Sequence, residues 1–155
     1  MLRSSDLLAL RVSDVINKNG SIKSEVKVRQ KKTGRLTLPL PLSITSLRAI
    51  TKHLSGKPLD DYIFKGQMYY CTKRPITSQQ YARIVKSWVE NIGIDDVSQY
   101  STHSMRKTKA SVIYMETKDV EACRRLLGQS SVIATSAYLG VTDNSALKLA
   151  KLTMV

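Results

Sequence analysis

The chain has 155 residues, and its 25 Lys and Arg against 12 Asp and Glu give a formal net charge of +13. Hydrophobic side chains make up 42% of the sequence, which is enough for one packed domain and argues against a disordered basic tail. Two cysteines, Cys71 and Cys123, without a CxxC pair exclude a disulfide scaffold and a structural zinc site. No apolar run is long enough to span a membrane, and the first residues do not resemble a signal peptide, so membrane and secreted classes are also excluded.

The positive charge is concentrated in two stretches of the chain. Residues 23–52 carry eight basic side chains and one acid, and residues 65–86 carry five basic side chains and no acid. A field this positive attracts polyanions, of which nucleic acid is the commonest in cells. Although a basic surface can also serve solubility alone, the segregation favours one positive face that contacts nucleic acid.

The N-terminal half is predicted to hold short helices and one hairpin. An apolar stretch over residues 7–15, preceded by the capping candidates Ser4 to Asp6, predicts a short helix. Apolar and basic residues alternate over 22–40, which predicts a β-hairpin that turns at Gly34 and whose second strand ends at Pro39 and Pro41. A helix over 43–54, a third short strand over 62–64 and a loop over 66–76 follow.

The C-terminal half is predicted to be helical. Residues 77–92 have apolar side chains at i, i+3, i+4, i+7 and i+8, which predicts an amphipathic helix with Trp88 in the core. Further helices are expected over 103–115, 120–127, 132–139 and 145–152. The fold class is therefore mainly α with a small antiparallel β-sheet, that is, α+β.

Several residues with side chains suited to catalysis lie at defined positions in these predicted elements. His103 and Arg106 lie three residues apart, so on a helix they project from one face. Tyr138 comes nine residues after Gln129, near a predicted helix end. Near the N-terminus Arg3 precedes an apolar helix, and Lys32 lies at the tip of the predicted hairpin.

In this order the motifs resemble those of the tyrosine recombinases, the phage integrase family, and are most similar to short bacterial integrases. The resemblance implies the tyrosine recombinase catalytic-domain fold over residues 1–155. The family's Arg box, hairpin lysine, His-x-x-Arg box, Leu-Gly-His/Trp box and nucleophile fall, in order, on Arg3, Lys32, His103, Arg106, Gln129 and Tyr138.

The resemblance implies that the chain breaks and rejoins DNA through a 3′-phosphotyrosine, with Tyr138 as the nucleophile. Arg3 and Arg106 would neutralise the non-bridging oxygens of the transition state, because guanidinium groups stay charged and match their geometry. Lys32 would protonate the leaving 5′ oxygen. His103 would assist proton transfer from Tyr138 or hydrogen-bond the phosphate. The chemistry needs no metal and no cofactor.

The expected partner is double-stranded DNA, with self-association on paired sites into a tetramer. Without DNA we expect a monomer, or a weak dimer that exchanges the segment 145–155. A cytoplasmic, nucleoid-associated protein encoded by a bacterium, phage or plasmid is expected. The side chains predicted to contact DNA are Lys31, Arg35, Lys73, Arg74, Arg83 and Lys107.

Two departures from the family pattern leave alternative functions open. Gln129 stands where the family usually has His or Trp, and an amide can donate a hydrogen bond but cannot carry charge or a proton. Arg3 lies two residues from the start, so the first helix and the N-terminal DNA-clamping region are expected to be absent. Both features favour an alternative, a catalytically inert DNA-binding remnant or regulator from a mobile element. A basic RNA-binding module is disfavoured because no exposed aromatic platform is evident.

Overall fold

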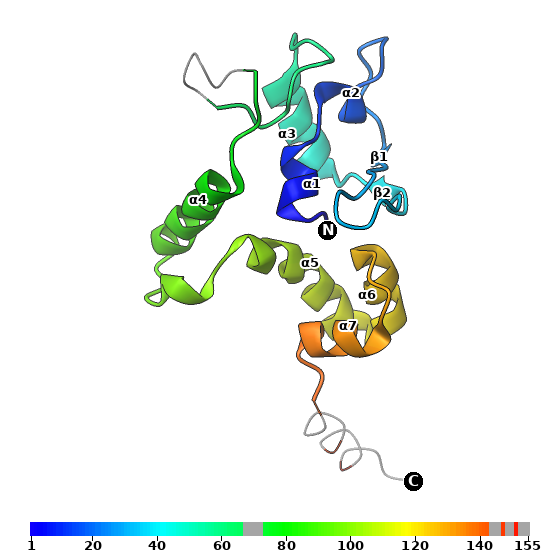
Figure 1. The fold of residues 1–155 in the computed structure, drawn as a ribbon, viewed down its shortest axis with the longest axis vertical. Coiled ribbons are helices and arrows are strands. Elements are labelled where there is room, and N and C mark those ends of the chain that lie inside the picture. Colours follow the sequence, from blue (N-terminus) through cyan, green and yellow to red (C-terminus); the bar gives the residue numbers. More distant parts are fainter. Residues whose placement is uncertain (67–72, 143–146, 148–150, 152–155) are drawn as a thin grey trace. The chain divides into compact units, whose positions relative to one another are not determined.

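The protein is described by a computed structural model covering residues 1–66, 73–142, 147 and 151 (Figure 1). The chain divides into two compact units, one of residues 2–104 and one of Met1 with residues 105–155. Over the described residues the fold is mostly helical with one two-stranded antiparallel sheet, which confirms the predicted class. The predicted helix over 145–152 lies outside the described residues except at 147 and 151, and the predicted loop over 66–76 does so at 67–72.

The first unit contains six of the labelled helices and strands, and a short 3₁₀ helix follows them. These elements are α1 (Ser4–Leu8), α2 (Val12–Val15), β1 (Glu25–Val26), β2 (Leu40–Pro41), α3 (Ile44–Leu54), α4 (Ser78–Asn91) and η2 (Val97–Gln99). Helix α5 (Thr102–Thr117) begins at the end of this unit and continues into the second. The second unit adds α6 (Val120–Leu127) and α7 (Val132–Leu139).

The single helix predicted over 7–15 is wrong, because the structure divides it into α1 and α2. The intervening backbone is paired with a segment about fifty residues further along. The Ile63 N–H donates to the Leu10 carbonyl at 2.9 Å, and the Val12 N–H donates to the Asp61 carbonyl at 2.9 Å. These long-range hydrogen bonds replace helical ones, so local apolar periodicity could not reveal the break.

The predicted hairpin over 22–40 is confirmed, with Val26 opposite Leu40 in the sheet. Its turn contains Gly34, whose φ of +67° is a conformation that residues with a side chain rarely adopt. The second strand does not end at its prolines, since Pro41 is itself part of β2. Proline is tolerated there because a two-stranded sheet consists only of edge strands.

Two other expectations in this unit are corrected. Residues 62–64 form no regular strand in the described structure; the first of them makes only an isolated bridge to Arg11. Trp88 is 49% exposed and not a core residue, whereas Val85 and Val89 of the same helix are buried. The apolar stripe of α4 is thus wider than the part of the helix surface that the rest of the protein buries.

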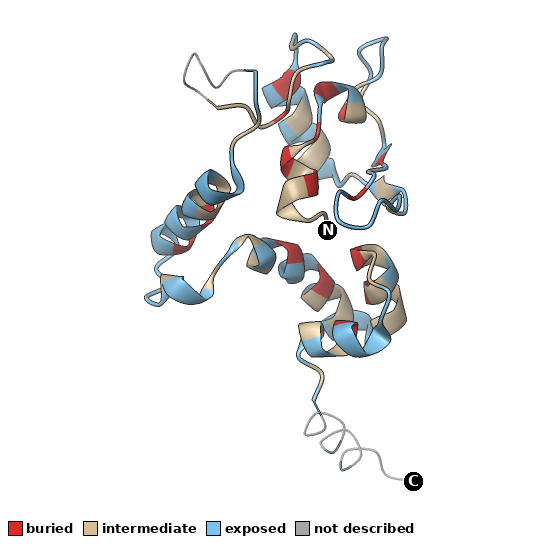
Figure 2. Ribbon diagram, viewed as in Figure 1, coloured by how far each residue is buried: buried red, intermediate tan, exposed pale blue. Residues whose placement is uncertain are grey.

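Each unit has its own buried residues, where the ribbon is red in Figure 2. The core of the first unit is Leu10, Val12, Val15, Val26, Leu54 and Ile63. In the second unit α6 packs against α7, and Ala110, Cys123, Leu127 and Thr135 are fully or almost fully buried. None of the described helices is long and apolar enough to cross a membrane.

The expected capping of the first helix by Ser4 to Asp6 is wrong, because these residues lie within α1, whose N-cap residue Arg3 makes no side-chain capping hydrogen bond in the described structure. Helices α6 and α7 are capped by side chains at their starts. Asp119 accepts a hydrogen bond from the Ala122 N–H at the start of α6, and Ser131 accepts one from the Ala134 N–H at the start of α7. Gly128 ends α6 in the left-handed conformation. Because α6 and α7 begin and end where they were predicted, the positions of Gln129 and Tyr138 relative to them are also as expected.

Candidate active site

Arg3 and the turn that carries Lys32 lie together in the first unit, although 29 positions separate them in sequence. Arg3 is the N-cap residue of α1, and its Nη1 donates to Gln30 Oε1 at 2.7 Å. Gln30 is only 4% exposed. Arg3 is therefore joined to the hairpin that carries Lys32 by a direct side-chain contact with Gln30.

Asp6 makes a second connection between α1 and the hairpin. Its carboxylate is 1% exposed, and Oδ1 accepts a hydrogen bond from the Lys31 N–H at 2.9 Å. Its Oδ2 has no hydrogen-bond partner among the described residues and lies 4.0 Å from Arg3 Nη1. Asp6 thus holds the hairpin backbone beside Lys32 and provides a negative charge next to Arg3.

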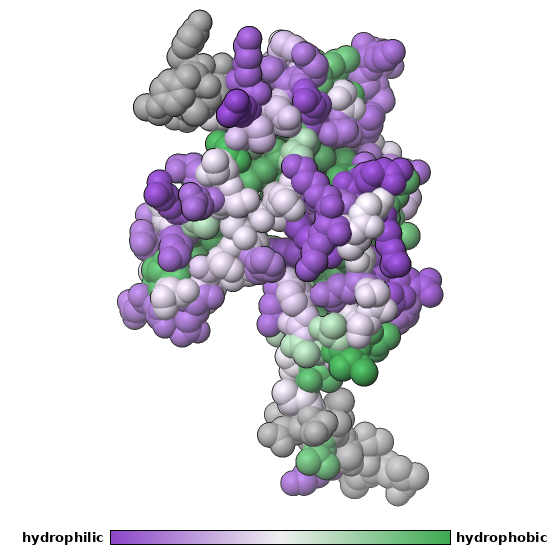
Figure 3. All heavy atoms as spheres, in the orientation of Figure 1, coloured by the Kyte–Doolittle hydropathy of each residue, from purple (hydrophilic) through white to green (hydrophobic). Residues whose placement is uncertain are grey.

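The side chains predicted to meet DNA are exposed. Lys32 is exposed at the hairpin turn, and Figure 3 shows hydrophilic side chains gathered over this hairpin. The same exposed state holds for Lys31, Arg35, Lys73, Arg74, Arg83 and Lys107. Exposure leaves these cations accessible to a polyanion, as a phosphate-binding role requires.

Arg106 and Tyr138 lie together in the second unit. Arg106 is 7% exposed, and its Nη2 donates a short hydrogen bond to the Leu127 carbonyl at the end of α6. Burial raises the pKa of the Tyr138 phenol above its usual 10.0, while the charge of Arg106 and a hydrogen bond from its guanidinium oppose that rise. The predicted nucleophile is therefore in contact with the predicted phosphate-binding arginine.

Lys107 contacts the aromatic ring of the same tyrosine. Its Nζ lies 5.8 Å from the centroid of the Tyr138 ring, within the range of a cation–π interaction. Consecutive residues of α5 thus place two cations around Tyr138, one at its phenol oxygen and one over its ring.

Gln129 is held at both its backbone and its side chain. Its carbonyl oxygen accepts from Arg124 Nη1 at 2.7 Å, and its Oε1 accepts from the Thr135 hydroxyl at 2.6 Å. Thr135 is fully buried, and its hydroxyl proton is shared with the Ser131 carbonyl at 2.8 Å. With Oε1 bound in this way, the amide NH₂ group is the part of Gln129 that can donate to a phosphate.

His103 is an exposed residue in the first turn of α5, and its backbone N–H donates to the Ser101 hydroxyl at 3.3 Å. It lies one helical turn before Arg106, as its spacing predicted. Arg3, Lys32 and His103 belong to the first compact unit, and Arg106, Gln129 and Tyr138 to the second. The joint use of all six on one phosphate stays a prediction.

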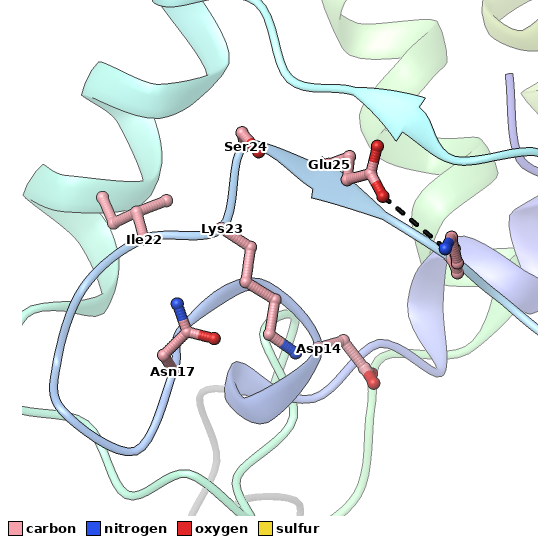
Figure 4. A pocket seen from close by; sticks show the side chains of 7 residues that line it. Asp14, Asn17, Ile22, Lys23, Ser24 and Glu25 are labelled. Atoms are coloured by element: carbon pink, nitrogen blue, oxygen red, sulfur yellow. Dashed lines mark ion pairs between the residues drawn. The ribbon is translucent and has the colours of Figure 1, made fainter.

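A surface hollow elsewhere in the first unit is separate from these residues (Figure 4). Its basic side chains are bound within the protein: Lys23 Nζ donates to the Ser13 carbonyl at 2.7 Å, and Lys27 Nζ lies 3.7 Å from Glu25 Oε1. The residues that line it are Asp14, Asn17, Ile22, Lys23, Ser24, Glu25 and Lys27. None is a predicted site residue, so we assign the hollow no part in catalysis.

Sequence reasoning missed three residues that hold the predicted ones. Gln30 binds Arg3, Arg124 binds the Gln129 backbone, and Thr135 binds the Gln129 side chain. Thr135 left a weak signal, since it and Ser136 are the two hydroxyl residues between the apolar start of α7 and Tyr138. Gln30 gave no such signal, because polar residues alternate along the whole hairpin.

Comparison with solved structures identifies the fold. The structure is similar to a crystal structure of XerA recombinase, with a TM-score of 0.71 and 20% identity over 97% of this chain and 53% of that one. It is also similar to XerH site-specific recombinase bound to its difH substrate, with a TM-score of 0.67 and 16% identity over 96% of this chain and 42% of that one. The fold is therefore that of the site-specific recombinases.

Sequence comparison identifies the family. The chain is 31% identical over 144 residues to the probable integrase/recombinase YoeC of Bacillus subtilis, covering 93% of this chain and 73% of that protein. It is 29% identical to the tyrosine recombinase XerC of Thermodesulfovibrio yellowstonii, covering 90% of this chain but only 46% of that protein. A sequence model of the phage integrase family matches residues 1–145. The chain belongs to the phage integrase family, the DNA breaking-rejoining tyrosine recombinases, which confirms the resemblance seen in the motifs.

Proposed function

We propose that residues 1–155 act as a catalytic domain that cleaves and rejoins double-stranded DNA through a covalent bond between Tyr138 and a 3′ phosphate. The contact of Tyr138 with Arg106 carries this proposal. A tyrosine placed beside a buried guanidinium can attack a phosphodiester while the same guanidinium neutralises the charge that develops on the phosphate.

The reaction balances without an external energy source. The Tyr138 Oη forms a bond to phosphorus and loses its proton, for which His103 is the proposed acceptor. The bond from phosphorus to the 5′ oxygen breaks, and Lys32 supplies the proton that this oxygen takes up. Rejoining is the reverse attack of a 5′ hydroxyl on the phosphotyrosine, so the energy of the broken bond is kept in the covalent intermediate.

Arg3 and Arg106 are proposed to bind the non-bridging oxygens of the same phosphate when DNA is bound. Each guanidinium is already oriented by the protein: Arg3 by Gln30 and Asp6, and Arg106 by the Leu127 carbonyl. Groups that are fixed before the reaction stabilise a transition state without the cost of reorganisation. Gln129 is proposed to add one neutral donor to this set.

Duplex DNA is the proposed partner. The similar XerH and Tn1549 integrase structures were solved in complex with DNA, which supports the same partner for this chain. Its net charge of +13 and the exposed cations of the hairpin supply phosphate contacts. Strand exchange between two duplexes is proposed to need four copies of the catalytic domain on paired sites.

A nicked-duplex assay tests the proposal. The substrate is a pool of duplexes with a randomised centre and a nick near each scissile position. Cleavage beside a nick releases a short fragment, so the strand cannot be rejoined and the covalent protein–DNA adduct accumulates. The adduct is detected on a denaturing gel. We expect an adduct from the wild-type chain and none from Tyr138→Phe. Tyr114→Phe is a matched control, because Lys118 lies 5.4 Å over the Tyr114 ring much as Lys107 lies over Tyr138. Retention of DNA without any adduct would favour the inert remnant instead.

A further inference from the structure

One oxygen atom joins the α1 end of the candidate site to the hairpin turn. Gln30 Oε1 accepts from Arg3 Nη1 at 2.7 Å and from the Thr33 hydroxyl at 2.8 Å. Gln30 is 4% exposed, so water does not replace these partners readily. Thr33 is the residue after Lys32, and the contact therefore reaches the turn on which the proposed general acid stands.

The backbone of the turn does not depend on the Gln30 side chain. The Gly34 N–H donates to the Gln30 carbonyl at 2.8 Å, and the Gln30 N–H donates to the Arg35 carbonyl at 2.9 Å. These two bonds close the turn through main-chain atoms alone. The hairpin turn is thus closed without the Gln30 side chain. The two groups that donate to this side chain belong to Arg3, the proposed phosphate-binding residue, and to Thr33, which follows the proposed proton donor Lys32.

The choice of an amide also suits a phosphate-binding arginine. A carboxylate at position 30 would accept the same two hydrogen bonds, but it would neutralise Arg3, which already lies 4.0 Å from Asp6 Oδ2. An amide orients the guanidinium and leaves its charge to the substrate. An apolar side chain of the same length would leave both donors without their acceptor.

We propose that Gln30 is a positioning residue that holds the Lys32 turn against Arg3, so that the proton donor and the phosphate-binding guanidinium are set at a fixed distance. This inference rests on the proposed function of Arg3 and Lys32. A misplacement of about 1 Å at a reacting centre can lower a rate by about 10²-fold. Loss of the Gln30 acceptor is therefore expected to slow cleavage while leaving the fold intact.

A change of leaving group separates positioning from a general structural role. In a duplex with sulfur in place of the bridging 5′ oxygen, the leaving group is a thiolate, which departs without a proton because thiols are far stronger acids than alcohols. A defect in placing Lys32 is therefore relieved on the sulfur substrate, whereas a defect in Tyr138, Arg106 or the fold is not.

The experiment measures adduct formation on both substrates by wild type, Lys32→Ala, Gln30→Met and Thr33→Val. Gln30→Met keeps the length of the side chain and removes the acceptor, and Thr33→Val removes one donor at an exposed position. Both are expected to slow cleavage of the ordinary duplex by about tenfold to 10²-fold. With sulfur, Lys32→Ala and Thr33→Val are expected to recover most of that loss, and Gln30→Met is expected to recover the part that comes from Lys32, because it also releases Arg3. Gln80→Met, an exposed change on α4, is expected to behave as wild type.

The possible failures are distinguishable. If Lys32→Ala recovers on sulfur but Gln30→Met and Thr33→Val cleave the ordinary duplex at the wild-type rate, or are slowed equally on both substrates, the proposed function stands and the role of Gln30 is overturned. If Gln30→Met does not fold, as judged by circular dichroism, Thr33→Val alone decides between these outcomes. If the wild-type chain forms no adduct on either substrate, both the proposed function and this inference are overturned.

Discussion

The Arg106 guanidinium is hydrogen-bonded to the Tyr138 phenol, and it opposes the rise in the Tyr138 pKa that burial causes. Burial is the larger influence, so the pKa stays above 10.0 and the phenol is protonated at neutral pH. Attack on a phosphate therefore needs the proton to leave, and Arg106 makes its departure easier by stabilising the phenolate.

Replacing Arg106 is expected to affect both the pKa and the rate. Arg106→Ala removes the two influences that lower the Tyr138 pKa, so that pKa rises further and any increase of cleavage rate with pH moves to higher pH. Loss of one preorganised donor at a developing anion typically costs about 10²–10³-fold in rate. Ultraviolet titration of Arg106→Ala with and without Tyr138→Phe gives the pKa, and adduct formation gives the rate. Arg125→Ala serves as the exposed control on α6; an unchanged Tyr138 pKa in Arg106→Ala would contradict the assignment.

Gln129→His is expected to preserve or raise cleavage, because an imidazole can donate the hydrogen bond that the amide NH₂ donates and can also carry a proton. Thr135→Val is expected to lower cleavage, since it frees the Gln129 amide without changing the volume of a buried residue. Adduct formation and thermal melting of both variants provide the measurement. Loss of cleavage in a normally folded Gln129→His would show that the amide has a role that an imidazole cannot fill.

The stability of the α6 region is expected to fall in acid through Glu121. Hydrogen bonds from Arg124 and then Arg125 lower the pKa of this carboxyl from 4.5 to about 2. Since the pKa is depressed in the folded state, the stabilisation is present above pH 4.5 and is lost as the pH falls toward 2. Melting temperatures of wild type and Glu121→Gln from pH 7 to pH 2 should therefore converge in acid. A difference that stays constant over this range would exclude the ion pairs as its cause.

DNA binding by this chain is expected to be weak, non-specific and strongly dependent on salt. With roughly 6–10 phosphate contacts, affinity should fall about 10³–10⁵-fold between 50 and 200 mM salt, because each contact releases condensed counterions. Fluorescence anisotropy with a random duplex measures the slope of log K against log salt concentration. Lys31→Ala and Arg35→Ala should each reduce the steepness of this slope more than Lys18→Ala, an exposed control in the same unit. A flat plot of log K against log salt, or nanomolar sequence-specific binding, would contradict this account.

Local sequence features predicted most of the helices. Helices α3, α4, α6 and α7 have capping residues at their starts and apolar residues at helical spacing, and these interactions are made within a few residues of sequence. The break between α1 and α2 was missed because it depends on hydrogen bonds to residues 59–63. The exposure of Trp88 was missed because an apolar stripe does not show how much of a helix another element covers.

In the candidate site too, the residues within the motifs were predicted from the sequence, and the residues that hold them in place were not. Motif order indicated Arg106 and Tyr138, and the structure places them in contact. The residues that hold the site could not be predicted, because the contact between Arg3 and Gln30 spans 27 positions and depends on how the hairpin meets α1. Such contacts depend on tertiary packing and leave no periodic pattern in the sequence.

The central claim is that Tyr138 alone becomes bonded to DNA, and mapping the adduct tests it most directly. The wild-type adduct is formed on the nicked-duplex pool, digested with a protease and a nuclease, and sequenced by mass spectrometry to find the tyrosine that carries the nucleotide remnant. We expect the remnant on Tyr138, joined through a 3′ phosphate. A remnant on Tyr100, Tyr114 or any other tyrosine, or a 5′ phosphate linkage on Tyr138, would contradict the account.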